Sequence, residues 1–196
     1  PGAEAIVDHG MRYLWEGHRD RRHGGYCWSV ADDGFKDDSK QAYGHAFVML
    51  AAADASMIGH PLAKEMLADV TDVLNIRFWD ENYGAVSEEF ARNWAKISTY
   101  RGQNSNMHLT EALMAAFEAT GTVDYLDKAK SIARLIIARH AASLDYAVAE
   151  HFDASWQLGK DYKGSDEFRP AGTTPGHWLE WSRLLMQLWV LGGKSH

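Results

Sequence analysis

The chain has 196 residues and a formal net charge of −7, and its length suits one domain with a substantial core over residues 1–196. The acidic balance and the dispersed basic residues argue against nucleic acid as a partner. The single cysteine, Cys27, excludes an internal disulfide and a cysteine-based metal cage. No hydrophobic run reaches the roughly 20 residues that a membrane span needs, so we expect a cytoplasmic protein with no membrane partner.

Helical periodicity predicts three helices and one β-hairpin in the first half of the chain. Ser39 is a candidate cap for the second helix, and a long loop leads from Gly84 to Arg101. A strand-like run, a turn at residues 31–34 and a polar return predict the short hairpin. The three helices cover residues 4–15, 39–58 and 62–78, and the hairpin covers residues 26–37.

The polar stretch from Tyr100 to Glu111 opens the central helix, which runs to about residue 120. Arg101 and Asn104 supply donors and acceptors, and His108 and Glu111 lie on one face of the helix because they are three residues apart. Asparagine and serine also favour helix N-caps, but a cap does not explain Arg101, His108 and Glu111. These side chains are therefore predicted to line a cavity.

Two more helices are predicted over residues 125–140 and 177–191, separated by a short extended piece at 146–152 and an irregular stretch at 153–175. Six helices joined alternately by short and long connections indicate stacked αα-hairpins with a functional face on the long-loop side. A weak repeat supports this arrangement, because His45, His108 and His177 each lie near the start of a helix. If those helices form an inner ring, the three imidazoles converge on one rim of an α/α toroid, and three hairpins form an open arc of it.

Two His-x-x-Glu pairs are the candidates for chemistry: His108 with Glu111, and His177 with Glu180. An imidazole beside a carboxylate suits acid/base catalysis. Two satisfied core histidines are the structural alternative. A carboxylate-bridged metal site is disfavoured, because that motif has the reverse order and needs two further bridging carboxylates. His45 alone is more often structural.

A second dense polar cluster, residues 150–153 with Trp156, precedes the irregular stretch and suits either a function or a salt-bridged loop anchor. The sequence has neither a glycine-rich phosphate loop after a strand nor a nucleophile elbow. A glycoside hydrolase would need two carboxyl groups across the scissile bond, whereas the prominent residues here are histidines.

Five ordered motifs resemble the N-acylglucosamine 2-epimerase superfamily, and within it the bacterial aldose–ketose isomerases that act on mannose or sulfoquinovose. The motifs are Gly24-Gly25-Tyr26, Ser39-Lys40-Gln41-Ala42-Tyr43-Gly44-His45, Tyr100-Arg101-Gly102-Gln103-Asn104-Ser105-Asn106-Met107-His108, Glu150-His151-Phe152-Asp153 and Thr174-Pro175-Gly176-His177-Trp178-Leu179-Glu180-Trp181. This resemblance implies an (α/α)6 barrel and cofactor-free aldose–ketose isomerisation through an enediol intermediate.

The resemblance also implies roles for single residues. His177 would be an acid/base histidine, and His108 and Glu180 would shape the catalytic pocket. No cofactor and no metal are expected. The predicted substrate-binding residues are Tyr43, Asn104, Arg101, Glu111 and Trp181.

The chain resembles the middle half of a family member. An arginine expected before Pro1 and a second acid/base histidine expected after His196 have no counterpart in it. Catalysis could therefore be lost, and N-acylglucosamine 2-epimerase activity or a non-catalytic sugar-binding or assembly module remain the alternatives. Half a ring leaves two open apolar flanks, which predicts a homodimer that closes the half-barrel.

Overall fold

A computed structural model of the chain describes residues 2–159, 162–163, 169 and 171–193. In this part of the chain, α1, α3 and α5 each continue into a π-helical turn, and a 3-10 turn follows the last of these turns. The turns are Leu14–His18, Leu74–Phe78, Arg134–His140 and Ala141–Leu144. The α-helices are α1 (Ala3–Tyr13), α2 (Ala42–Met57), α3 (Ala63–Val73), α4 (Gln103–Thr120), α5 (Val123–Ala133) and α6 (Pro175–Leu191).

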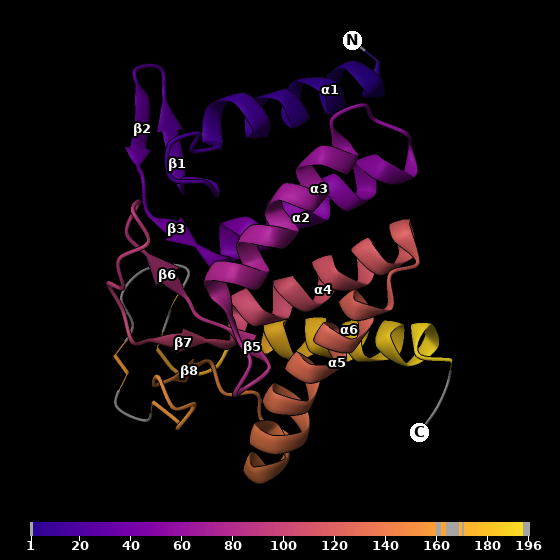
Figure 1. The fold of residues 1–196 in the computed structure, drawn as a ribbon. Coiled ribbons are helices and arrows are strands. Elements are labelled where there is room, and N and C mark those ends of the chain that lie inside the picture. Colours follow the sequence, from indigo (N-terminus) through magenta and orange to yellow (C-terminus); the bar gives the residue numbers. More distant parts are fainter. Residues whose placement is uncertain (1, 160–161, 164–168, 170, 194–196) are drawn as a thin grey trace.

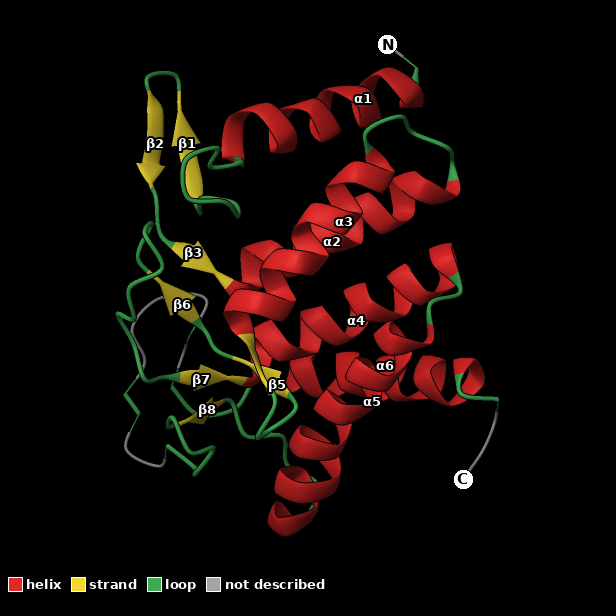
Figure 2. Cartoon of the chain, in the orientation of Figure 1, coloured by secondary structure: helices red, strands yellow, loops and turns green. Residues whose placement is uncertain are grey.

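The helices form two layers (Figure 1). In one layer α4 packs between α2 and α6, and in the other α3 and α5 pack against α2 and α4. Short connections join α2 to α3 and α4 to α5 at one end of the layers. The strands and long loops gather at the opposite end, where α2, α4 and α6 begin (Figure 2). This arrangement matches the predicted stacked hairpins with one long-loop face.

Short antiparallel strand pairs tie the long loops together at that end. Strand β3 ends directly before α2, and β7 ends directly before α4, so each pairing fixes where an inner helix begins. The four pairs are β1 (Ser29–Ala31) with β2 (Gly34–Asp37), β3 (Lys40–Gln41) with β6 (Glu89–Phe90), β4 (Trp79–Asp80) with β5 (Ala85–Val86), and β7 (Arg101–Gly102) with β8 (His151–Phe152).

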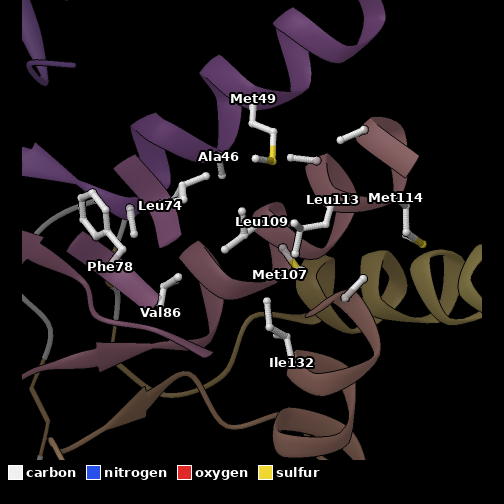
Figure 3. Close-up of a cluster of buried hydrophobic side chains, with 14 of the residues drawn as sticks. Ala46, Met49, Leu74, Phe78, Val86, Met107, Leu109, Leu113, Met114 and Ile132 are labelled. Atoms are coloured by element: carbon white, nitrogen blue, oxygen red, sulfur yellow. The ribbon is translucent and has the colours of Figure 1, made fainter. Parts of the chain in front are cut away.

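The main core lies between α2 and α4 and extends to α3 and α5 (Figure 3). Buried residues on α2 include small ones such as Ala46, and Leu109 and Met107 are buried on the neighbouring helix α4. Full burial of a side chain such as Leu109 stabilises the fold by about 1.5–3 kcal/mol. The rigid core thereby fixes the first turns of both helices, which carry polar residues.

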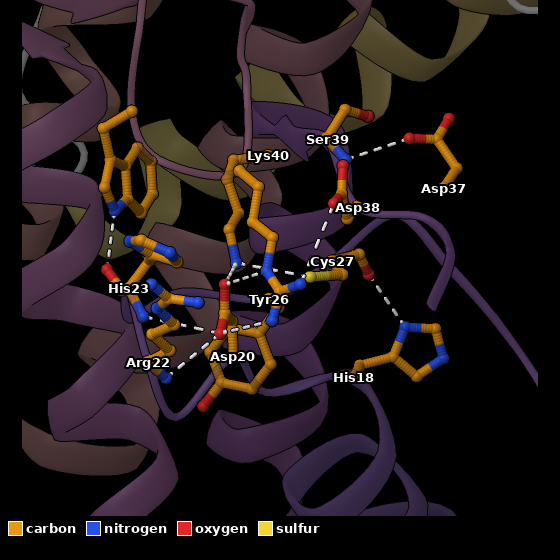
Figure 4. Close-up of polar contacts among 12 residues, drawn as sticks. His18, Asp20, Arg22, His23, Tyr26, Cys27, Asp37, Asp38, Ser39 and Lys40 are labelled. Atoms are coloured by element: carbon orange, nitrogen blue, oxygen red, sulfur yellow. Dashed lines mark hydrogen bonds and ion pairs between the residues drawn. The ribbon is translucent and has the colours of Figure 1, made fainter. Parts of the chain in front are cut away.

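A buried ionic cluster anchors the chain before α2 (Figure 4). The carboxylate of Asp20 is 1% exposed and lies 3.2 Å from Nζ of Lys40 and 2.9 Å from Nε of Arg92. Burial would raise the pKa of Asp20, but hydrogen bonds from Arg92, the Arg22 backbone and Lys40 lower it below its usual value. Loss of one partner would leave a buried charge without compensation. The cluster therefore fixes Lys40, the first residue of β3.

Three sequence predictions about the secondary structure need correction. The hairpin forms at Ser29–Asp37, so it begins three residues later than expected. The cap at Ser39 is wrong: β3 keeps the backbone extended as far as Gln41, and the carbonyl oxygen of Glu88 accepts the N–H of Ala42 at 2.9 Å. The long loop from Gly84 to Arg101 contains strands β5 and β6. No helix among the described residues is long and apolar enough to cross a membrane.

Candidate active site

The candidate site lies where α2, α4 and α6 begin, and hydrogen bonds reveal which of their residues are equivalent. The N–H of Ala42 donates to the carbonyl oxygen of Glu88 at 2.9 Å, and the N–H of Gln103 donates to that of Glu150 at 3.1 Å. Both donors are the first residues of inner helices, and both acceptors precede a short strand. Pro175 is the corresponding first residue of α6.

This register places residues of successive helices side by side. Phe47, His108 and Glu180 each occupy the sixth position of their helix. The rings of Phe47 and His108 are 4.8 Å apart, and Nδ1 of His108 lies 3.9 Å from Oε1 of Glu180. Tyr43, at the second position of α2, has its ring centroid 5.1 Å from that of His108. His108 is therefore the centre of a row of predicted site residues.

Burial and nearby negative charge have opposite effects on the pKa of His108. Its Nδ1 atom lies 3.6 Å from Oε2 of Glu111, which is longer than a hydrogen bond, and it has no hydrogen-bond partner although it is buried. Burial lowers the pKa of His108 below its ordinary value, although Glu180 and Glu111 act in the opposite direction. A neutral imidazole in this place can accept or donate a hydrogen bond, but it does not carry a permanent charge.

His177 has a different partner from the one that the sequence predicts. Its Nδ1 atom lies 2.9 Å from Oε2 and 3.0 Å from Oε1 of Glu150, whereas Glu180 contacts His108 and Arg183. Glu150 is 5% exposed and also accepts the N–H of Thr174 at 3.2 Å. The hydrogen bond to Glu150 raises the pKa of His177, because the carboxylate stabilises the imidazolium.

Gln103 and Trp181 form a chain of hydrogen bonds to the pair of Glu150 and His177. The indole Nε1 of Trp181 donates to Oε1 of Gln103 at 2.7 Å, so the amide nitrogen of Gln103 faces Glu150 and donates to it at 2.8 Å. Trp181 is 1% exposed. The predicted substrate-binding residue Trp181 therefore contacts Gln103, which the sequence places among the polar residues of the 100–111 stretch. Glu150 was predicted only as part of the polar cluster at residues 150–153.

The prediction that three histidines converge on one rim is wrong for His45. This ring is fully buried, its Nδ1 donates to the carbonyl oxygen of Gln41 at 2.7 Å, and its Nε2 accepts the N–H of Tyr26 at 3.0 Å. His45 occupies the fourth position of α2, which is the position of Asn106 in α4. Asn106 forms the same two types of hydrogen bond, to the carbonyl oxygen of Gly102 and from the N–H of Val86, each at 2.9 Å. Both side chains therefore have a structural role: each joins the start of its helix to the backbone of another segment.

Asn104 and Arg101 each have a buried polar atom with no hydrogen-bond partner: Oδ1 of Asn104 and Nε of Arg101. Asn104 is the neighbour in register of Tyr43, because both are the second residues of their helices. Arg101 is 4% exposed and donates from Nη1 to the carbonyl oxygen of Tyr100 at 3.0 Å. Unpartnered buried polar atoms are costly, and a ligand hydroxyl can satisfy them.

His108, Glu111 and Glu180 are also a candidate metal-binding group, since their ligand atoms lie within 4.8 Å of one another. Arg183 already supplies a positive charge there, because its Nη2 lies 2.5 Å from Oε1 of Glu111 and 3.7 Å from Oε1 of Glu180. This guanidinium offsets part of the negative charge of the two carboxylates without a metal ion. The absence of a metal stays a prediction.

Comparison with known proteins assigns the family. A sequence profile described as "N-acylglucosamine 2-epimerase (GlcNAc 2-epimerase)" matches residues 1–196. The chain belongs to the N-acylglucosamine 2-epimerase family. It is 45% identical to a D-mannose isomerase from Pseudomonas cannabina pv. alisalensis over 191 residues and 44% identical to one from Thermobifida fusca over 192 residues. Each match covers 96% of this chain but only 46% and 47% of the two relatives, so the chain spans about half their length.

Solved structures confirm the predicted fold. A crystal structure of D-mannose isomerase matches with a TM-score of 0.88 at 39% identity, over 95% of this chain and 48% of that one. A cellobiose 2-epimerase from Spirochaeta thermophila matches with a TM-score of 0.81 at 22% identity and shows the fold alone. The chain is thus about half of an (α/α)6 epimerase barrel. Its inner helices are α2, α4 and α6.

Proposed function

We propose that this chain supplies half of the active site of an aldose–ketose isomerase for mannose-like monosaccharides. The observation that carries the proposal is the pair of Glu150 and His177, with an Nδ1–Oε2 distance of 2.9 Å. Because Nδ1 donates its proton to Glu150, Nε2 of the neutral ring has the lone pair that a general base needs. The D-mannose isomerases that are more than 40% identical to this chain support the substrate class.

In the proposed reaction, His177 removes the proton from C2 of the open-chain aldose. The electron pair of the C2–H bond forms the C1–C2 double bond of an enediol as the C1 carbonyl oxygen gains a proton. Loss of the O2 proton and protonation of C1 then give the ketose. His108 and Asn104 would bind sugar hydroxyls, since each has a buried polar atom without a hydrogen-bond partner.

Two further functions are separable by assay. A family epimerase would invert C2 of N-acetylglucosamine, so interconversion of mannose, fructose and glucose is compared with that of N-acetylglucosamine and N-acetylmannosamine. The identities to D-mannose isomerases favour the first reaction. A non-catalytic sugar-binding module would bind mannose without turnover, and Asn104→Ala would abolish that binding. Turnover of N-acetylglucosamine alone would refute the isomerase proposal.

We propose further that two copies of the chain close a ring. One open flank is an apolar groove of about 600 Å³ between α1 and α2, and the other is a groove of about 540 Å³ between α5 and α6. Ile58 beside the first groove is 67% exposed, and Trp189 in the second is 45% exposed. Asp54 lines the first groove, while Lys130 and Arg134 line the second, so opposite flanks of two copies have complementary charges.

Each copy in such a ring would repeat the same catalytic residues, so we expect weak or absent turnover even where mannose binds. Sedimentation equilibrium at micromolar concentration measures the assembly directly. A species of twice the 22.0 kDa chain mass is the expected result. A stable monomer would refute the dimer without affecting the sugar-binding proposal.

A further inference from the structure

Glu88 is a buried carboxylate that the proposed reaction does not use. It lies between β5 and β6 and is 6% exposed. Oε1 accepts the hydroxyl of Ser105 at 2.6 Å, and Oε2 accepts the N–H of Gly102 at 3.2 Å. Both partners belong to the start of α4, and Asn104 lies between them in the sequence. A carboxylate at a helix N-terminus also interacts favourably with the helix dipole.

The position of Glu88 matches that of Glu150 in the next repeat. The backbone oxygen of each residue accepts the N–H of the first residue of an inner helix, Ala42 for Glu88 and Gln103 for Glu150. The side chain of each then binds the N-cap N–H of the following inner helix: Gly102 for Glu88 and Thr174 for Glu150.

The third residue of that following helix completes the pattern. It is Ser105 for Glu88 and His177 for Glu150, with partners at 2.6 Å and 2.9 Å. The same carboxylate position therefore holds a histidine in one repeat and a serine in the other. Serine has no group that titrates near neutral pH. Glu88 therefore stabilises the start of a helix, and it does not raise the pKa of a base as Glu150 does.

Arg169 extends these contacts to the segment before α6. Its Nη2 lies 3.5 Å from Oε1 of Glu88 and 3.1 Å from Oε2 of Glu89. Burial raises the pKa of Glu88, and Arg169 and Ser105 oppose that shift. Through its backbone and its side chain, Glu88 thus contacts the starts of α2 and α4, and its carboxylate also faces Arg169.

We propose that Glu88 is a positioning residue that sets the place of Asn104 in the sugar pocket by holding the first turn of α4. This inference rests on the proposed function for its sugar-binding readout. Loss of the Glu88 side chain would free the Gly102 N–H and the Ser105 hydroxyl together. The first turn of α4 would then exchange with water more readily, and Asn104 would lose its fixed orientation.

The test compares Glu88→Ala with Glu88→Gln. Glutamine can accept the Gly102 N–H with its carbonyl oxygen and donate its amide to the Ser105 hydroxyl, so it keeps both hydrogen bonds and loses only the charge that faces Arg169. We expect Glu88→Ala to speed amide exchange at Gly102 and to weaken D-mannose binding by about tenfold or more each. Glu88→Gln should restore both to within a few-fold of the unmodified chain.

A second pair of variants covers the case in which Glu88→Ala does not fold. Ser105→Ala removes one contact of Glu88 and should raise Gly102 exchange. Ser56→Ala is its control, because that hydroxyl donates to the carbonyl oxygen of Ala52 near the far end of α2. Equal Gly102 exchange in Ser105→Ala and Ser56→Ala, or no rescue by Glu88→Gln, would overturn the proposal. If the unmodified chain binds no mannose, the sugar-binding proposal fails. The role of Glu88 is still tested by Gly102 amide exchange and by comparison of the NMR signal of the Asn104 side-chain amide between the unmodified chain and the variants.

Discussion

Nδ1 of His177 lies within 3.0 Å of both carboxylate oxygens of Glu150, a residue that precedes it by 27 positions. This contact raises the pKa of His177. Replacement by Glu150→Gln keeps a hydrogen-bond acceptor but removes the charge, so the pKa of His177 should fall to or below its ordinary value of about 6.5. Titration of the Cε1–H signal of His177 by NMR measures the change.

Glu180→Gln is the matched control, because Glu180 also raises the pKa of His177 but less than the hydrogen-bonded Glu150 does. We expect Glu180→Gln to shift the His177 titration less than Glu150→Gln does. If turnover is detectable, it should begin to rise at a lower pH in Glu150→Gln than in the unmodified chain, because His177 becomes neutral at a lower pH in this variant. An equal His177 titration in both variants would contradict the assigned pairing.

Removal of the base itself should separate binding from turnover. His177→Ala is expected to abolish whatever isomerisation the chain performs while it changes the mannose dissociation constant by no more than about an order of magnitude, since an acid/base group acts mainly in the transition state. His45→Ala should reduce turnover per folded molecule less, because His45 is fully buried. Isothermal titration and a coupled fructose assay measure the two quantities. Lost binding with unchanged turnover per bound sugar would contradict this role for His177.

The sequence predicted the fold well because helical periodicity and the short breaks between paired helices are local signals. It placed His108, Glu111 and Glu180 at one site, and these residues do lie together. It assigned the wrong carboxylate to His177, because spacing within one helix cannot reveal a partner brought in by the β7–β8 pair. The dense polar run at residues 150–153 was the available signal for Glu150.

The histidine repeat misled for a related reason. His45, His108 and His177 occupy the fourth, sixth and third positions of their helices, and one residue changes the direction of a helical side chain by about 100°. Only the backbone hydrogen bonds of Ala42 and Gln103 fix the true register. A sequence motif cannot define that register when loop lengths differ between repeats.

His45 should make the stability of the fold depend on pH. Burial lowers its pKa to about 4. The unfolded chain, with a pKa of about 6.5 for this residue, binds a proton that the folded chain does not bind, so stability is fully present above that pH and falls as the pH decreases toward 4. The full difference corresponds to roughly 3 kcal/mol. Urea unfolding at pH 7 and pH 4.5 measures most of this difference.

The control for this pH effect is His45→Asn, because Asn106 forms the equivalent two hydrogen bonds in α4. Asparagine does not titrate, so this variant should lose less stability between pH 7 and pH 4.5, whatever its stability at pH 7. A pH dependence equal to that of the unmodified chain would show that other groups cause it.

Gly25 is a position where one added methyl group should clash with neighbouring side chains. Its φ is +70°, and a Cβ atom there would lie 2.8 Å from Cζ2 of Trp94 and 2.9 Å from Nε2 of His45. Gly24 has a similar φ of +75° but open space around it. Gly24→Ala should therefore cost only the backbone strain of about 1 kcal/mol. Gly25→Ala adds a clash with Trp94 and His45, so it should reduce the free energy of unfolding by about 1–3 kcal/mol more than Gly24→Ala does. Urea unfolding of the two variants isolates the steric part, and equal losses of stability would mean that Trp94 and His45 move aside without cost.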